Sequence, residues 1–393
     1  MDRRQFLATG AVATGAVAFG GSLWRSAWAA PARAGVGPYG ALRTADANGV
    51  RLPQGFTSRI VARTGQRVAG TSYVWHGAPD GGATFETSTE NGWIYVSNSE
   101  LNAPAGGASA IRFAGDGRIL NAYRILSNTD RNCAGGPTIV GSRSTSARWL
   151  SGEEVSRGLM WECDPRGHNP PVARPGMGAF THEAAAVDPV RRAVYLTEDR
   201  VDGNFYRYRP TTWPDLSSGV LEVLCASQQA TSGPVTWKKV PNPTPTPSQT
   251  STRLQVAGAY KFNGGEGCWY EDDICYFTTK NDNRVWAYNA ATQSFNLFYD
   301  DDLAGPQTEL RGVDNITMSR SKDLYVAEDG DNLQVCLITP DEIVSPFLQL
   351  VGHNNSELTG VAFNPRGDRL YFSSQRGTDG NGVTFEIRGA FRS

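Results

Sequence analysis

The chain has 393 residues and a formal net charge of −2, from 37 basic and 39 acidic side chains. This nearly balanced charge, without a Lys/Arg-rich stripe, argues against nucleic acid as a partner. The 44 glycines, 22 prolines, 10 tryptophans, 14 tyrosines and 16 phenylalanines punctuate short apolar runs without long amphipathic stretches, which favours an all-β protein.

The first 29 residues have the features of a twin-arginine export signal. Arg3 and Arg4 precede a Gly/Ala-rich apolar run, which ends in the Ala-x-Ala cleavage pattern at 27–29. This run is too short to span a membrane, and no later stretch is long enough to do so. We therefore expect passage through the twin-arginine translocase and a secreted or periplasmic mature protein without a stable membrane anchor.

A repeat of nearly fifty residues follows. In each copy an acidic or Cys/Asn cluster is followed by an aromatic-led strand that runs into polar or acidic residues. The strands are anchored at Tyr95, Trp149, Tyr195, Tyr276, Tyr325 and Tyr371, with gaps of 54, 46, 81, 49 and 46. A period near fifty is typical of propeller blades, so the sequence predicts a six-bladed β-propeller with a metal site on its central axis.

The predicted domain boundaries follow from this repeat. Residues 30–54 form an N-terminal extension, and residues 55–393 form the propeller. The long gap contains a proline-rich loop insertion at about 238–254, which we interpret as a solvated, polyproline-like segment. The chain ends in the strand 383–387, which we expect to pair with the N-terminal region and close the ring.

Six cysteines occur along the chain. Cys268 and Cys275 flank an acidic turn, so a disulfide across that hairpin and two unpaired thiols are both open. Cys133 differs from the others because it lies in an Asn-Cys-Ala-Gly-Gly loop. A buried, inert thiol is the simplest interpretation of any one of them.

Acidic residues recur in phase with the predicted strands. In a propeller, equivalent ends of the inner strands converge on one axis. Several carboxylates at one axis would be unstable without cations. Their oxygens suit Ca²⁺ or Mg²⁺, and a thiolate among them would suit a softer ion such as iron. The repeats begin at Glu86, Cys133, Glu183, Glu266, Asp314 and Glu357.

These patterns resemble the PhoX-type alkaline phosphatases from about Trp75 to the C-terminus. The resemblance rests on the segment 149–154, His182-Glu183, Glu266-Gly267, Asp314-Asn315 with Glu328-Asp329, and the segment 360–375. It implies Ca²⁺ and Fe³⁺ on the axis of a six-bladed propeller. It places Cys133, Glu183 and Glu266 at iron, as the catalytic set. It places Glu154, Asp314, Asn315, Glu328 and Glu357 at calcium, with Asp199 and Glu100 as further candidates.

The sequence leaves two alternatives for the phosphate-binding cation and two for the role of His182. The resemblance predicts an arginine that grips a phosphoryl oxygen two residues before Glu266, where this chain has Gly264. Either the activity is weakened or another residue, such as Arg131 or Arg376, takes the role. His182 is either an acid or donor beside Glu183 or a packing residue.

The resemblance implies a hydrolase of the alkaline phosphatase type that acts on small-molecule phosphate esters. We expect a monomer in which a metal-bound oxide or hydroxide attacks phosphorus, because bound ions neutralise the phosphoryl oxygens and the leaving alkoxide. Two alternatives are a calcium-dependent propeller hydrolase of another ester class, lactonase-like, and a calcium-stabilised binding propeller without catalysis.

Overall fold

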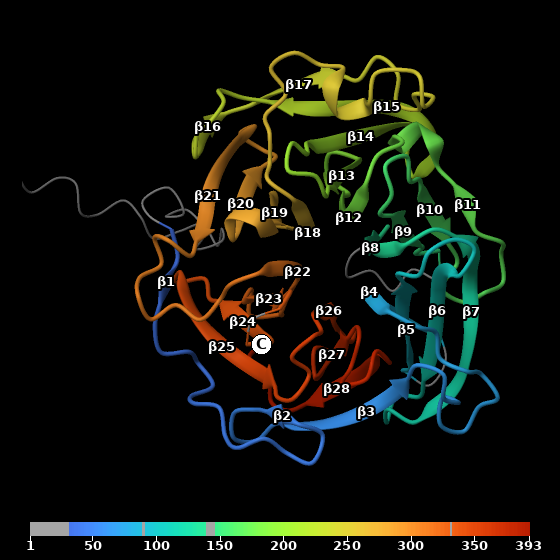
Figure 1. Cartoon of the computed structure of the whole chain (residues 1–393), viewed down its shortest axis with the longest axis vertical. Helices are drawn as coiled ribbons and strands as arrows, with labels where there is room; N and C mark the ends of the chain where they lie inside the picture. Colours follow the sequence, from blue (N-terminus) through green and yellow to red (C-terminus); the bar gives the residue numbers. More distant parts are fainter. Residues whose placement is uncertain (1–30, 89–90, 139–145, 331) are drawn as a thin grey trace, which may run out of the picture.

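The computed structural model describes residues 31–88, 91–138, 146–330 and 332–393. The predicted export signal therefore lies outside the described residues. Within them the strands form six sheets arranged around a central axis (Figure 1), antiparallel except for the short parallel pair of β1 with β25. The predicted six-bladed propeller is confirmed. Regular helix is limited there to three short 3-10 turns, Pro175–Met177, Thr252–Leu254 and Lys280–Asp282, and none of the described helices could cross a membrane.

The first three blades follow the chain, each from its innermost strand outward. Blade 1 consists of β4 (Pro79–Glu86), β5 (Trp93–Ser99), β6 (Gly106–Phe113) and β7 (Ile119–Thr129). Blade 2 consists of β8 (Asn132–Pro137), β9 (Trp149–Glu153), β10 (Met160–Cys163) and β11 (Val172–Ala173). Blade 3 consists of β12 (His182–Asp188), β13 (Ala193–Glu198), β14 (Phe205–Thr212), β15 (Asp215–Cys225) and β17 (Thr236–Lys239).

The remaining blades recruit strands from elsewhere in the chain. Blade 4 consists of β18 (Gly265–Glu271), β19 (Ile274–Thr279), β20 (Arg284–Asn289), β21 (Ser294–Asp300) and the earlier β16 (Ser232–Pro234). Blade 5 consists of β22 (Val313–Met318), β23 (Leu324–Glu328), β24 (Gln334–Ile338) and β25 (Ile343–Leu350), with the N-terminal β1 (Arg33–Ala34) and β2 (Val50–Arg51) against β25. Blade 6 consists of β26 (Leu358–Phe363), β27 (Arg369–Ser374), β28 (Val383–Arg388) and β3 (Thr57–Arg63).

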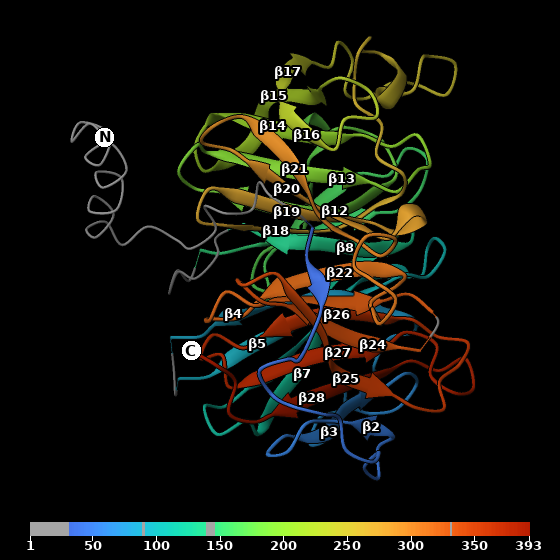
Figure 2. The same cartoon turned by 90° about the vertical axis from the view of Figure 1, so that its left-hand side faces the viewer.

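Pairing of the two chain ends closes the ring. The last strand, β28, pairs antiparallel with β3 over Val383↔Arg63 to Arg388↔Thr57. Figure 1 shows β3 and β28 side by side at the lower edge, and Figure 2 shows the same blades from the side. A strand from each end of the propeller in one sheet ties the first and last blades together without an exposed edge between them.

Packing between blades explains why an aromatic residue marks each repeat. The buried apolar residues that the structure describes form six clusters between neighbouring sheets, and one of them also includes Ala134 of blade 2 beside residues of blades 3 and 4. Tyr95 and Tyr371 stack at 4.8 Å between blades 1 and 6, and Phe205 and Phe277 stack at 4.2 Å between blades 3 and 4. Because these strands are buried on both faces, they read in the sequence as nearly continuous apolar runs.

Small residues on the inner strands let neighbouring blades approach closely. A Cβ added at Gly136 of β8 would lie 1.8 Å from the carbonyl oxygen of Ala185 of β12. We therefore expect Gly136→Ala to lower the free energy of unfolding by about 1–3 kcal/mol, since a backbone atom must move. Denaturant unfolding measures this, with Gly77→Ala as the matched control. A Cβ at Gly77 would meet only the side chain of Leu101, at 3.1 Å. Equal losses in the two variants would contradict the packing argument.

Candidate metal centre

A β-bulge near the start of each innermost strand aims one residue at the axis. The pairing between the first two strands of every blade shifts at this place. A bulge inserts an unpaired residue and redirects its side chain. We define the inner ring as the residues at five of these bulges: Asp80, Cys133, Glu183, Glu266 and Asp314. The equivalent residue of blade 6 is Gly360.

A second set of polar side chains follows the second strand of each blade, and in blade 6 this residue is the neutral Gln375, after β27. We define the outer ring as the five residues that come directly after β5, β9, β13, β19 and β23: Glu100, Glu154, Asp199, Lys280 and Asp329. Since side chains alternate along a strand, the residue before each of these faces the other way. Four blades thus deliver a carboxylate to this ring and blade 4 delivers a lysine.

The two rings bring potential ligand atoms within 4.8 Å of one another in three overlapping groups. The groups are Asp80, Glu100 and Cys133; Cys133, Glu154 and Glu183; and Glu183, Glu266 and Asp314. Cys133 and Glu183 each belong to two groups, and the Cys133 thiol donates to Glu183 Oε1 at 3.2 Å. The structure therefore gathers seven potential ligands from five blades into one continuous cluster.

Glu357 and Asp329 extend the cluster between blades 5 and 6. Glu357 lies just before β26 and is buried. Burial, reinforced by Asp329, raises the pKa of Glu357 to about 8. Arg376 Nη2 approaches Glu357 Oε1 at 3.1 Å. This part of the site therefore also combines two carboxylates with one cation.

Burial and mutual repulsion raise the pKa values of the clustered acids. Burial is the main cause for Asp80, Glu183 and Asp314, whose pKa values lie well above their ordinary range, and neighbouring carboxylates add to the effect. Burial and Glu100 raise the pKa of Glu154 to about 9, although Arg131 opposes the shift. Without a compensating positive charge, these groups would hold protons at neutral pH.

The donor set fits a site for metal cations. Among the described residues, Glu183 Oε2 is buried and has no hydrogen-bond partner. A buried carboxylate oxygen without a donor is costly, and a cation relieves that cost. Carboxylate oxygens suit Ca²⁺, and a thiolate beside carboxylates suits iron. Burial and the nearby acids raise the pKa of the Cys133 thiol, so a bound cation would be needed to favour its thiolate.

Three cationic side chains stand against the acidic rings. Arg131 contacts Glu100 and also Glu154, at 2.5 Å from Glu154 Oε2. Lys280 Nζ lies 2.6 Å from Glu266 Oε1 and 3.0 Å from Asp199 Oδ2. Together with Arg376, these residues carry positive charge at three places around the cluster.

The structure corrects the predicted ligand Glu328. Its two carboxylate oxygens accept hydrogen bonds from the backbone N–H groups of Arg311 and Gln334, at 3.0 and 2.7 Å, and tie the surrounding loops together. The next residue, Asp329, takes the place in the outer ring. Glu153 and Glu198, which precede Glu154 and Asp199, likewise accept backbone N–H groups outside the three ligand groups.

Sequence reasoning also missed Asp80. It assigned Glu86 to the first repeat, but Glu86 is the last residue of β4, whereas Asp80 occupies the bulge near its start. Asp80 Oδ1 accepts a bond from Gly81 N at 2.6 Å, and Gln375 Nε2 donates to Asp80 Oδ2 at 2.5 Å. A small residue directly follows four of the five inner-ring residues, as in Glu266-Gly267 and Cys133-Ala134, and this was the sequence signal that could have identified Asp80.

Two further polar residues predicted near the cluster differ in their contacts. Asn315 Nδ2 donates to Asp314 Oδ1 at 2.8 Å, and Asn315 Oδ1 accepts Gly360 N at 2.6 Å, so this amide links blades 5 and 6. His182 is buried with one ring nitrogen 3.0 Å from Gly178 O, and its ring packs on Phe180. Burial lowers the pKa of His182 to about 4. This surrounding favours the packing interpretation of His182.

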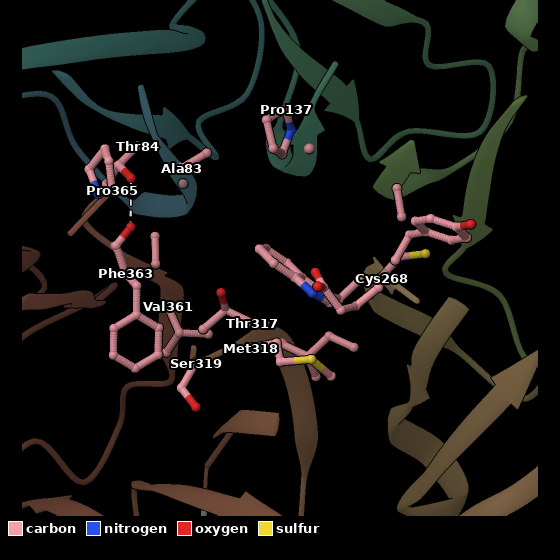
Figure 3. Close-up of a pocket in the computed structure, with 18 of the residues that line it drawn as sticks. Ala83, Thr84, Pro137, Cys268, Thr317, Met318, Ser319, Val361, Phe363 and Pro365 are labelled. Carbon is pink, nitrogen blue, oxygen red and sulfur yellow. Dashed lines mark hydrogen bonds between the residues drawn. The ribbon is translucent and has the colours of Figure 1, made fainter. Parts of the chain in front are cut away.

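Two spaces lie along the inner strands. A narrow one borders the residues next to the inner ring, and a larger cavity adjoins it further along the same strands. The narrow space has a volume of ≈ 30 Å³ and is bordered by Gly81, Ala134, Ala184 and Gly267, each directly after an inner-ring residue. The cavity beyond it has a volume of ≈ 550 Å³. Its walls include Cys268, Met318, Val361 and Phe363 (Figure 3). None of the predicted ligands is among the described residues that line it, so we place the metal chemistry in the rings rather than in the larger cavity.

All six cysteines are free thiols. Cys268 Sγ and Cys275 Sγ lie 3.3 Å apart within the β18–β19 hairpin without a bond between them. The unpaired alternative for these two residues is therefore the one that the structure shows.

Comparison with known proteins identifies the family. No curated protein matches the chain. A structural-genomics protein of unknown function from Bacteroides thetaiotaomicron aligns with a TM-score of 0.52 and 8% identity, over 85% of this chain and 76% of that one. A candidate 6-phosphogluconolactonase from Bacteroides uniformis aligns with a TM-score of 0.43 and 13% identity, over 74% and 76% of the two chains. At these identities the first alignment supports the fold alone.

The family model described as alkaline phosphatase PhoX matches residues 150–377, which is more than half of the chain. The matched segment includes seven of the ten ring residues, among them Glu154, Glu183, Glu266 and Asp314. It begins after Asp80, Glu100 and Cys133, which the propeller brings to the same cluster. The chain therefore belongs to the PhoX alkaline phosphatase family.

Proposed function

We propose that this protein is an exported, metal-dependent phosphatase that hydrolyses phosphomonoesters at the axis of the propeller. Membership of the PhoX family supports a phosphatase function. The observation that carries the proposal is the run of three overlapping ligand groups joined by Cys133 and Glu183. So many buried carboxylates would repel a phosphate dianion, and bound cations reverse that repulsion.

The proposed ion assignment follows the chemistry of the donors. Cys133, Glu183 and Glu266 would hold iron, since the thiol is the softest donor in the cluster. Calcium would be held by the hard oxygen donors of both rings and of Glu357. The calcium ligands proposed are Asp80, Glu100, Glu154, Asp199, Asp314, Asp329 and Glu357.

The chemistry proposed for these ions is to neutralise the phosphoryl oxygens and the leaving alkoxide and to lower the pKa of a water. The chain itself positions the ligands through bulges in rigid strands. It closes one side of the site with small residues, and it holds three cations around the acidic rings. No buried histidine or serine beside the cluster is needed as a nucleophile in this proposal, and His182 packs against Phe180.

We also propose that the protein is exported through the twin-arginine pathway and that it is a monomer. Support for export comes from the arginine pair and cleavage pattern of residues 1–29. Twin-arginine export carries folded proteins, so the metals would be loaded before the chain meets an oxidising compartment. That order would protect the Cys133 thiol, because exposed thiolates are readily oxidised.

A direct test compares two substrate classes on the exported protein. We expect hydrolysis of a generic phosphomonoester at alkaline pH, loss of this turnover on chelation of Ca²⁺, and its return when Ca²⁺ is added back. A lactone serves as the competing substrate. Lactone turnover without phosphate release would instead support the lactonase-like alternative, and full metal occupancy with neither activity would support a binding propeller.

Replacement of Cys133 separates the two kinds of ion. Cys133→Ser should remove iron, and any visible absorption of a thiolate–iron site, while calcium and the fold remain. The reason is that a hydroxyl is a poor ligand for a softer ion but leaves the carboxylates in place. Metal analysis and absorption spectra measure the result, with Cys163→Ser, in an outer strand of blade 2, as the matched control. Unchanged iron in Cys133→Ser, or a Cys133 disulfide in the native protein, would contradict the assignment.

A further inference from the structure

Lys280 is the exception among the outer-ring residues. The residue directly after the second strand is a carboxylate in blades 1, 2, 3 and 5, where it is Glu100, Glu154, Asp199 and Asp329. In blade 4 the same place is taken by Lys280, which follows β19. The register of the bulge pairing is the same in blade 4 as in blades 2 and 5, so Lys280 is structurally equivalent to the acids. The chain therefore places a fixed positive charge where four other blades place a carboxylate and blade 6 places the amide of Gln375.

The contacts of Lys280 show where this charge lies. Its Nζ bridges Glu266 of the inner ring, at 2.6 Å, and Asp199 of the outer ring, at 3.0 Å. An ammonium carries three N–H donors, so these two contacts leave one direction for a further acceptor. Its side chain is 32% exposed, compared with 3% for Glu266. The ammonium thus reaches from the buried acids to the solvent-facing side of the cluster.

Gly264 makes room for this lysine. Lys280 N donates to Gly264 O at 2.9 Å, which holds the two residues side by side. A Cβ added at Gly264 would lie 3.3 Å from Lys280 Cγ and 2.5 Å from Asn281 Nδ2. Gly264 has φ +77°, a conformation that favours glycine. The side chain of Asn281 and the stem of Lys280 therefore together occupy the space that a side chain at position 264 would need.

The other two cations are placed less favourably for an anion held at the inner ring. Arg131 contacts Glu100 and Glu154, both of the outer ring, and its side chain is 40% exposed. Arg376 contacts Glu357, and its side chain is 47% exposed. Of these three residues, Lys280 is the one with a contact to an inner-ring carboxylate and the least exposed side chain.

We propose that Lys280 binds a phosphoryl oxygen of the substrate, as the protein's own cation in a ring that otherwise presents metal ligands. This inference rests on the proposed phosphatase function, because it assumes that a phosphate group occupies the cluster. An ammonium that shares two carboxylates with the metal centre would meet the same anion as the metals. A hydrogen bond from a charged donor to a phosphoryl oxygen is short and strong, and Lys binds phosphate as a point charge.

The experiment measures phosphate affinity separately from turnover. Inorganic phosphate is titrated calorimetrically into the metal-loaded protein, for the native chain, Lys280→Met, Lys280→Gln and Lys280→Arg. The metal content of each sample is measured in parallel, and thermal melting confirms the fold. Lys322→Gln is the matched control, since Lys322 is also paired with two acids, Glu271 and Asp272, but lies in the turn between β22 and β23.

We expect Lys280→Met and Lys280→Gln to weaken phosphate binding by about 10- to 100-fold at unchanged metal content, as the loss of a hydrogen bond to a charged group predicts. Lys280→Arg should keep most of the affinity, and the control should match the native chain. Affinity within about twofold of native in both charge-free variants would overturn the inference, and so would loss of metal ions together with phosphate binding.

Failure of the proposed function gives a different result. In that case the native metal-loaded chain would bind phosphate without hydrolysing phosphomonoesters, and the titrations would still decide the role of Lys280. A native chain that hydrolyses phosphomonoesters while the Lys280 variants bind phosphate normally would keep the function and reject the inference. A native chain that neither bound phosphate nor hydrolysed phosphomonoesters would reject both.

Discussion

Glu183→Gln should lower phosphomonoester turnover at least about 100-fold and reduce the number of bound metal ions. Glu183 belongs to two of the three ligand groups, and its buried Oε2 has no hydrogen-bond partner among the described residues. An amide offers one neutral oxygen and one N–H₂ group, so it repels a cation on one side. Loss of residues that merely support metal ligands already costs about 10–100-fold, and a shared ligand should cost more.

The matched control is Glu86→Gln, which makes the same change on an innermost strand. Glu86 ends β4 and lines the separate cavity, not the rings. Turnover and metal content should therefore stay close to native in Glu86→Gln. Steady-state kinetics and metal analysis on both variants check the prediction. Native-like metal content in Glu183→Gln would show that Glu183 is not a metal ligand shared between two groups of the cluster.

Removal of the metals should destabilise the protein far more at pH 9 than at pH 5. In the metal-free fold, burial and neighbouring acids raise the pKa of Glu154 to about 9 and that of Glu357 to about 8. The unfolded chain releases these protons near pH 4.5, the ordinary glutamate value. The folded state therefore binds more protons than the unfolded state between these limits, and its stability falls as the pH rises through that window.

Bound cations reverse this trend, because they favour the ionised carboxylates. We expect chelation to lower the melting temperature by on the order of 10 °C at pH 9 and by little at pH 5, as a penalty of several kcal/mol in a chain of this size implies. Thermal melts with and without chelator at the two pH values measure the difference. Equal shifts at both pH values would mean that repulsion among these acids does not control stability.

The fold could be predicted because a buried aromatic residue marks each repeat. Tyr95, Trp149 and Tyr195 lie in second strands that are buried between blades, where only a large apolar side chain fills the space. The aromatic residues that mark the repeat lie in the second strand of each blade. The innermost strand comes just before it in the chain, so the residues that converge on the axis include acids that precede the aromatic residues.

The candidate ligands were harder to choose because a shift of one residue turns a side chain to the other face. Acidic doublets end β9, β13 and β23, and in each the second residue belongs to the outer ring. The sequence favoured Glu328 over Asp329, since the exact strand register cannot be seen in a doublet. Asp80 was missed because an acid before two glycines also reads as a turn.

Lys280 shows a further limit of sequence reasoning. A lysine after a strand reads as a solvated surface residue. Its partners, Glu266 and Asp199, lie 14 and 81 residues away in the chain, and only the ring of blades brings them to its ammonium. The departure at Gly264 was visible in the sequence, whereas the residue that fills the space beside it was not.

Metal analysis of the exported native protein tests the central claim most directly. The account predicts that the protein retains iron together with calcium after gel filtration, and that Ca²⁺ chelation removes phosphomonoester turnover along with the calcium. A folded protein that carries neither ion yet hydrolyses phosphomonoesters at full rate would contradict it, because the buried acids of the two rings would then have no role in catalysis.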